Sequence, residues 1–156
     1  MSLTAPVRRK RILAVASGGG HWEELLLLRP AFEDQDVLFA TTLAGLAERA
    51  GLTRHAMLPD CNADQKLAAL RCTLAAAWLL LRFRPQVIIS TGALPGFIVI
   101  AIGKAFGART IWIDSIANAE EFSAAGAHAR RVADLRLSQW PDVADAGHAE
   151  YAGNLL

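Results

Sequence analysis

Short apolar runs alternate with helical segments along the chain, and this alternation most restricts the folds that the sequence can adopt. Such runs, separated by helices and ending at turn residues, are typical of the buried strands of a parallel sheet. Strands joined through helices pair by right-handed crossovers, which place helices on both faces of the sheet. We expect strands over Arg11–Ala16, Asp36–Thr42, Arg54–Leu58, Gln86–Ser90, Ala108–Asp114 and Leu135–Gln139.

The segments between these strands predict helices, and the whole pattern predicts an α/β fold with a Rossmann-like open parallel sheet. The length of 156 residues fits one domain over residues 1–156. Asp64 is placed to cap the longest helix, and Gly51 to end a shorter one. Residues 115–126 are expected to be irregular, and the tail beyond Pro141 is weakly patterned. The helices are expected over Trp22–Arg29, Leu43–Ala50, 64–83, Gly96–Phe106 and Ala127–Ala133.

Hydrophobic residues make up 53% of the chain, more than a soluble domain usually contains. This surplus predicts contact with a partner subunit or with a membrane surface. The segment Leu67–Leu81 is apolar nearly all round, but it is too short, and too interrupted by arginine, to span a bilayer. It is either a core helix that is covered on every side or a contact surface for a protein or a membrane.

The net charge of +1 gives no overall positive electrostatic field that would attract nucleic acid, and we expect no nucleic-acid partner. The exception is the basic cluster Arg8–Arg11, which is either a solvated leader or a site of attraction to anionic lipid headgroups. Met1–Pro6 is too short and too polar for a secretory signal. We therefore expect a cytoplasmic location, with peripheral contact at the membrane.

Cysteine and histidine spacing argues against metal and disulfide chemistry. Cys61 and Cys72 lie eleven positions apart without a CxxC pair, which favours a reduced compartment. The histidines at positions 21, 55, 128 and 148 are scattered, and neither cysteine lies at ligand spacing from them. We expect no metal site.

Three glycines follow the first expected strand, in a turn that opens a helix. The turn consists of Ser17, Gly18, Gly19, Gly20 and His21. Consecutive glycines let the backbone approach a ligand, and a helix N-terminus adds partial positive charge, which suits a phosphate or diphosphate. The spacing is neither GxGxxG nor that of a P-loop. The alternative is a tight strand-to-helix turn without a ligand.

His21 is a candidate general base, because a neutral imidazole can take a proton from an attacking hydroxyl. Glu24 lies one helical turn further on and is a candidate to orient that imidazole. Asp114, at the carboxyl end of the fifth expected strand, is a second candidate base or a ligand for an acceptor hydroxyl. For His21 and Asp114 the alternative is a capping role, and for Glu24 it is a favourable charge at the helix N-terminus.

Two further turns lie at carboxyl ends of strands, where an open parallel sheet binds its ligands. Ser90, Thr91 and Gly92 carry hydroxyl and amide groups that can hold a phosphate or a sugar. The alternative is an ordinary capped turn. Ser115 and Asn118 lie in the turn that follows Asp114, and we assign them to acceptor or phosphate binding.

Together these motifs resemble one family. The stretches 17–25, 84–92, 113–118 with Ser123 and Gly126, 133–135 and 138–141 resemble markers of bacterial polysaccharide-biosynthesis glycosyltransferase subunits. Those subunits are related to the acceptor subunit of the eukaryotic dolichol-linked UDP-N-acetylglucosamine transferase. Relatives often carry Glu where Asp114 stands and Arg where Asn118 stands. The first change keeps the acid, and the second removes a charge that could hold a diphosphate.

The resemblance implies a GT-B glycosyltransferase divided between two polypeptides, with this chain as the N-terminal, acceptor-binding half. It is also similar to the N-terminal half of the single-chain enzyme that adds N-acetylglucosamine to lipid-linked muropeptide. The implied partner binds a UDP-sugar donor, and no cofactor is expected. The implied acceptor is a polyprenyl-diphosphate-linked sugar at the inner face of the plasma membrane. Alternatives are a non-catalytic scaffold that recruits the donor subunit, and a free-standing nucleotide-binding domain.

Overall fold

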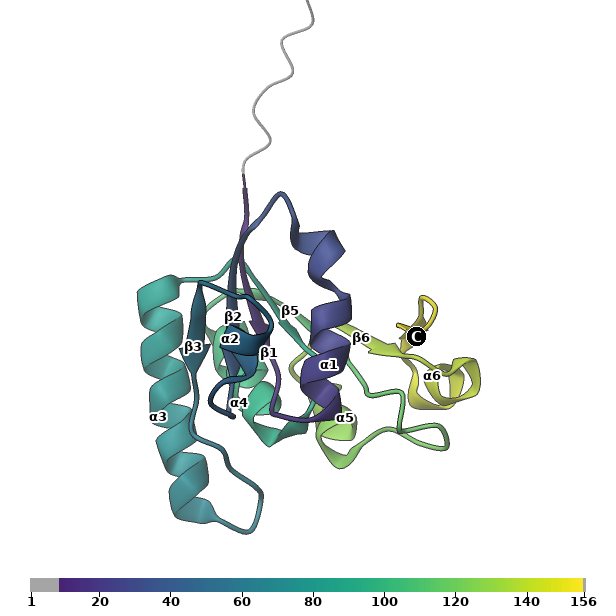
Figure 1. Ribbon diagram of the computed structural model, residues 1–156. Helices are drawn as coiled ribbons and strands as arrows, with labels where there is room; N and C mark the ends of the chain where they lie inside the picture. The colour runs from purple at the N-terminus through teal and green to yellow at the C-terminus, as the bar shows by residue number, and fades with distance from the viewer. Residues whose placement is uncertain (1–8, 156) are drawn as a thin grey trace, which may run out of the picture.

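The computed structural model describes residues 9–155 and has one sheet of seven parallel strands (Figure 1). The six strands expected from the sequence are present, so the Rossmann-like prediction is confirmed. The order across the sheet is β3-β2-β1-β4-β5-β6-β7. The strands are β1 (Arg11–Val15), β2 (Asp36–Thr41), β3 (His55–Met57), β4 (Val87–Ser90), β5 (Arg109–Ile113), β6 (Leu135–Ser138) and β7 (Glu150–Tyr151).

The strand order reverses between β1 and β4. From β1 the chain builds outward through β2 to β3, and then it returns to pair β4 with the other side of β1. The loops after β1 and β4 therefore leave in opposite directions, and open parallel sheets bind their ligands at such a point of the carboxyl edge. In the register of this pair Val15 lies opposite Ser90, so the Ser17–His21 turn and the Ser90–Gly92 turn are neighbours.

Helices cover both faces of the sheet, as expected. One apolar core forms against α3, α4 and α5, and a second forms against α1, the 3-10 helix η1 and α2. Figure 1 shows α1 and α3 at separate positions around the sheet, with α6 beyond the β6 edge. The helices are α1 (Gly20–Leu27), η1 (Arg29–Phe32), α2 (Leu46–Arg49), α3 (Lys66–Phe83), α4 (Ala93–Ala105), α5 (Ala124–Ala129) and α6 (Pro141–Gly147).

Several helix ends differ from the sequence prediction. Asp64 does not cap α3, because the N-cap residue is Gln65 and no side chain bonds there. Instead the Asn62 side chain accepts hydrogen bonds from the N–H groups of residues 64 and 65. Helix α4 begins at Ala93, three residues before the expected start, and α5 occupies 124–129 instead of 127–133.

The tail beyond Pro141 was expected to lack clear structure, and it forms α6 and the edge strand β7. Pro141 occupies the first turn of α6, where its missing N–H costs nothing, and Asp142 follows at the positive helix end. Val143 and Ala144 are buried. The helix was missed because only two of its seven residues are buried, too few to produce an apolar period.

Helix α3 resolves the two interpretations of Leu67–Leu81. One face is core, with Cys72, Ala76, Leu79 and Leu80 buried, and the opposite face is exposed. It is therefore not covered on every side. No helix within residues 9–155 is long and apolar enough to cross a membrane. Arg8 and Met1–Pro6 lie outside the described residues.

Candidate active site

His21 and Thr91 join the two turns at the reversal of strand order. The Thr91 hydroxyl Oγ1 donates to the His21 carbonyl at 2.6 Å, and His21 Nδ1 lies 3.0 Å from the Thr91 carbonyl oxygen. A carbonyl oxygen can only accept a hydrogen bond, so Nδ1 carries the hydrogen. In the neutral imidazole, Nε2 then holds the free lone pair. The geometry thus leaves His21 Nε2 as a proton acceptor.

Gly92 makes room for this imidazole. A Cβ atom at position 92 would lie 2.4 Å from His21 Nδ1, so any side chain there would displace the ring. Gly92 also has φ 144°, which favours glycine. His21 thus connects the two glycine-containing turns. The order of residues within either turn does not by itself predict this contact.

The first glycine turn is open toward solvent. A Cβ atom at Gly19 or Gly20 would meet no atom within 4 Å, and Gly19 has φ 71°. The Gly19 carbonyl accepts the first helical bonds, from Trp22 and Glu23. Within residues 9–155, the N–H groups of Gly20 and His21 have no hydrogen-bond acceptor. This N-terminus of α1 has the free donors and partial positive charge that hold a phosphate.

Gly18 and Ser17 support the turn from within. A Cβ at Gly18 would lie 3.2 Å from the Leu43 Cβ, so the first glycine allows close packing on the segment after β2. The Ser17 hydroxyl is half-buried and donates to the Gly18 carbonyl at 3.4 Å. Of the three glycines, therefore, the second and third are the ones whose Cβ positions face open space.

The second turn is built from buried hydroxyls. Ser90 and Thr91 are fully buried, and the Ser90 Oγ accepts the Gly92 N–H at 3.2 Å. Both hydroxyls therefore shape the turn, and this favours the capped-turn interpretation of these two residues. Ala93 has φ 65°, a left-handed conformation that costs about 1 kcal/mol or more for a residue with a Cβ. Such strain is often found at functional turns.

Glu24 is buried and bonds away from His21. Its Oε1 accepts the Ser115 hydroxyl at 2.7 Å and the Ile116 N–H at 3.2 Å, and its Oε2 accepts Gln139 Nε2 at 3.1 Å. These contacts tie α1 to the ends of β5 and β6. They do not support the expectation that Glu24 orients the imidazole. Sequence reasoning gave Gln139 no role of its own, although it lies in the stretch 138–141 that resembles a family marker.

Asp114 is 2% exposed, and both of its carboxylate oxygens are occupied. Oδ1 accepts the Trp112 indole N–H at 2.9 Å and the Ser123 hydroxyl at 2.6 Å, and Oδ2 accepts the Ser123 N–H at 2.8 Å. Ser123 in turn caps α5 by accepting the Gly126 N–H. The geometry favours the capping role, since a carboxylate this enclosed does not reach an acceptor hydroxyl.

Ser115 and Asn118 behave differently from each other. The Ser115 hydroxyl is buried against Glu24 and accepts the Ala117 N–H at 3.3 Å, so it holds the turn. Asn118 is half-buried, and its backbone N–H bonds to the Ser115 carbonyl. Of the residues assigned to acceptor binding in this third turn, Asn118 therefore has the more accessible side chain.

The two cysteines form a buried pair between α3 and the loop before it. Cys72 lies in α3, and Cys61 lies close enough to it for the thiols to interact. Burial raises the pKa of the Cys72 thiol to about 12 and also raises that of Cys61. Both thiols stay protonated at neutral pH and are poor nucleophiles. Among the described residues, no group of three or more His, Cys, Asp or Glu is placed to hold a metal ion.

No known family's sequence profile matches the chain, and no curated protein matches it in sequence. Solved structures match it in fold. MurG of Acinetobacter baumannii superposes with a TM-score of 0.70 at 13% identity, over 86% of this chain and 43% of its own. MnaA of S. aureus, solved with UDP, gives 0.70 at 11%, over 94% and 44%. The UDP-N-acetylglucosamine 2-epimerase of Rickettsia bellii gives 0.71 at 6%, over 95% and 46%.

These likenesses define the class of the fold. The chain has the fold of one half of the GT-B-like UDP-sugar glycosyltransferases and epimerases. It spans less than half the length of the three structures compared. At 6–13% identity the likeness concerns fold alone.

Proposed function

We propose that this chain is the acceptor-binding half of a two-chain, inverting glycosyltransferase that uses a UDP-sugar donor. The observation that carries the proposal is the position of His21. Within residues 9–155 the His21 Nε2 has no hydrogen-bond partner, its ring is fixed by Thr91 and Gly92, and the N–H groups of Gly20 and His21 beside it are unbound. The proposed acceptor is a polyprenyl-diphosphate-linked sugar at the cytoplasmic face of the membrane.

In the proposed reaction, His21 Nε2 takes the proton of an acceptor hydroxyl. The hydroxyl oxygen attacks the anomeric carbon of the donor sugar from the side opposite UDP. The bond from that carbon to the UDP oxygen breaks, and UDP leaves with the electron pair, which inverts the configuration. The N–H groups of Gly20 and His21 hold the acceptor diphosphate, and the positive end of α1 stabilises it. Positioned general bases of this kind contribute about 10²–10⁴-fold to a rate.

The donor site belongs to a partner chain in this proposal. The support is the fold likeness, in which this chain matches 43% of the MurG structure and 44% of the MnaA structure, so that a complete fold of that kind needs a second half. A second Rossmann-like half placed over the carboxyl edge of the sheet would exclude water and bring the UDP-sugar to His21. Neither chain alone should transfer sugar.

The test is co-expression with the candidate donor subunit and an assay of transfer from UDP-sugars to a lipid-linked acceptor. His21→Ala should lower kcat by about 10²–10⁴-fold. His128→Ala, at an exposed histidine on α5, should leave it unchanged. Full transfer by His21→Ala would exclude the catalytic role, and full transfer without a partner would exclude the two-chain arrangement.

A second candidate is a non-catalytic scaffold that recruits the donor subunit to the membrane, and the exposed apolar face of α3 favours it. A scaffold tolerates His21→Ala but fails when that face is made polar. Tight UDP binding by the isolated chain in calorimetry would point instead to a free-standing nucleotide-binding domain.

A further inference from the structure

Five large apolar side chains form an exposed line along α3. They are Leu67, Leu70, Leu74, Trp78 and Leu81, and each is between 54% and 63% exposed. Their spacing of three and four residues keeps them on one face of the helix. We call this set the α3 stripe. Single exposed leucines are ordinary on soluble proteins, but a continuous line of this kind marks an interaction surface.

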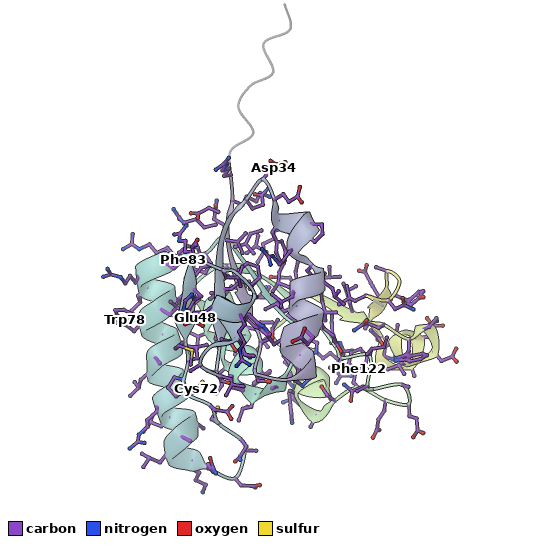
Figure 2. All side chains as sticks on the ribbon, viewed as in Figure 1. Asp34, Glu48, Cys72, Trp78, Phe83 and Phe122 are labelled. Atoms are coloured by element: carbon purple, nitrogen blue, oxygen red, sulfur yellow. The ribbon has the colours of Figure 1, made fainter. Side chains whose placement is uncertain are left out.

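The stripe is not a poorly packed part of the core. The core contacts of α3 come from Cys72, Ala76, Leu79 and Leu80, which alternate with the stripe at helical spacing and lie on the opposite face. In Figure 2 Trp78 points away from the sheet, on the outer side of α3. The sheet is therefore already covered, and within residues 9–155 the stripe remains exposed for contact with something outside this domain.

The charged side chains of helix α3 itself all have one sign. Helix α3 carries Lys66, Arg71 and Arg82, all exposed, and it contains no acidic residue. The Arg82 guanidinium lies over the Trp78 ring at 5.6 Å from its centre, so cation and aromatic share one surface. Leucine and tryptophan on one helix with cations beside them are typical of helices that lie in a membrane interface.

Charge also decides against a second copy of this chain. Two α3 helices packed face to face would bring Arg71 and Arg82 of both copies together, and α3 itself has no acid to pair with them. An anionic surface complements the same pattern. We propose that the α3 stripe docks this chain on an anionic lipid bilayer, with the helix axis in the membrane plane. This deepens the proposed function and rests on it in one respect, since a lipid-linked acceptor lies at a membrane.

The position of α3 suits that task. The helix begins after β3, at the carboxyl edge of the sheet where the glycine turn lies, and it runs back to the opposite edge before β4 (Figure 1). Docking through the stripe therefore brings the start of α3, at the carboxyl edge of the sheet, to the bilayer. At the far end of α3, Leu81 borders a cavity of about 700 Å³ that Arg11, Arg84 and Phe106 also line. This cavity extends the apolar and basic surface.

The test is co-sedimentation of the full chain with vesicles of phosphatidylglycerol and phosphatidylcholine, and with vesicles of phosphatidylcholine alone. Only the anionic vesicles should bind it strongly. Leu70→Gln/Leu74→Gln/Trp78→Gln should weaken binding more than about tenfold, and Arg71→Gln about fivefold. Leu27→Gln, at an exposed leucine on α1, and Arg131→Gln, at an exposed arginine beyond the end of α5, serve as matched controls. Circular dichroism checks that every variant is folded.

Wild-type binding by the triple variant would overturn the proposal, as would a wild-type chain that binds no vesicles. So would a triple variant that keeps vesicle binding and loses only the donor subunit, because the stripe would then be a protein interface. Transfer to a water-soluble, short-chain acceptor separates this proposal from the proposed function. If vesicle binding depends on the stripe but no sugar is transferred, the proposed function alone is excluded. If sugar is transferred but the chain does not bind vesicles, the docking proposal alone is excluded.

Discussion

His21 and Thr91 hold each other through two hydrogen bonds, one from the threonine hydroxyl to the histidine carbonyl and one from the imidazole to the threonine carbonyl. The pair connects the start of α1 to the end of β4, seventy positions further along the chain. It fixes both the place of the ring and the nitrogen that carries the hydrogen. The catalytic proposal for His21 depends on this pairing.

Thr91→Val should therefore impair catalysis more than substrate binding. Valine keeps the shape of threonine but cannot donate to the His21 carbonyl, so the start of α1 is held less firmly. We expect a kcat about tenfold lower with little change in KM, and a stability loss of about 1 kcal/mol. Thr91→Ser keeps the hydroxyl and should retain most of the activity. Equal kcat for the valine and serine variants would show that the hydroxyl does not position His21.

Gly20→Ala tests whether the glycine turn approaches a ligand. A Cβ at Gly20 meets no protein atom, and its φ is not positive, so alanine should raise helix stability by about 0.5–1 kcal/mol. If a diphosphate lies against this backbone, the same methyl group should raise the KM for the lipid-linked acceptor. Thermal unfolding and steady-state kinetics measure the two effects. A more stable protein with unchanged KM would favour a turn without a ligand.

Gly92→Ala should lower both stability and kcat, whereas Gly20→Ala should raise stability. The added Cβ would lie 2.4 Å from His21 Nδ1 and would force the ring away from Thr91. We expect loss of stability and a large fall in kcat together, because the strain and the displaced imidazole have one origin. Normal activity in a folded Gly92→Ala protein would contradict the placement of His21.

Asp114→Asn separates capping from catalysis. Every recorded partner of this carboxylate is a donor, so the asparagine NH2 group must face a donor at Trp112 or Ser123. We expect a stability loss of about 1–3 kcal/mol in urea unfolding. Activity per folded molecule should change little. A fall of about 10²-fold in kcat without a loss of stability would restore Asp114 as a candidate base.

The fold could be predicted from the sequence because its strands are continuous apolar runs with glycine or polar ends. By this criterion the sequence alone assigns a strand to Arg11–Val15 and another to Val87–Ser90. Strand β7 is two exposed residues long, and its place depends on pairing with β6, which no local pattern encodes. Asp64 precedes α3 and has the residue type of a cap, yet Asn62 supplies the bonds because the loop turns two residues earlier.

The strand ends that carry the candidate residues could be predicted from the sequence, but the contacts of each side chain could not. Carboxyl ends of parallel strands meet at one edge, so His21, Ser90 and Asp114 were expected near one another. Which of them faces solvent depends on packing between distant segments. Gly126 fits against Asp114 and leaves no room for a Cβ, whereas Gly20 opens onto solvent. The sequence shows which positions are acidic and which are glycine, but it does not show which of them are buried in the folded chain.

Glu24 gives the last prediction, because this buried acid anchors the candidate site without touching its base. Its carboxylate receives three donors, from Ser115, Ile116 and Gln139. Glu24→Ala leaves these donors without their acceptor and should cost about 2–4 kcal/mol, whereas Glu24→Gln keeps one oxygen and should cost less. Glu23→Gln, at the exposed neighbouring position, should cost nothing measurable. Urea unfolding measures all three.

A double-mutant cycle with Ser115→Ala then tests the contact itself. If Glu24 stabilises the fold through that hydroxyl, Glu24→Gln and Ser115→Ala should be non-additive by about 0.5 kcal/mol or more. Transfer by folded Glu24→Gln protein should stay close to normal, since its carboxylate bonds to the ends of β5 and β6 and not to His21. Additive stabilities combined with a lost kcat would mean that Glu24 acts on the chemistry, and that α1 is held by other contacts.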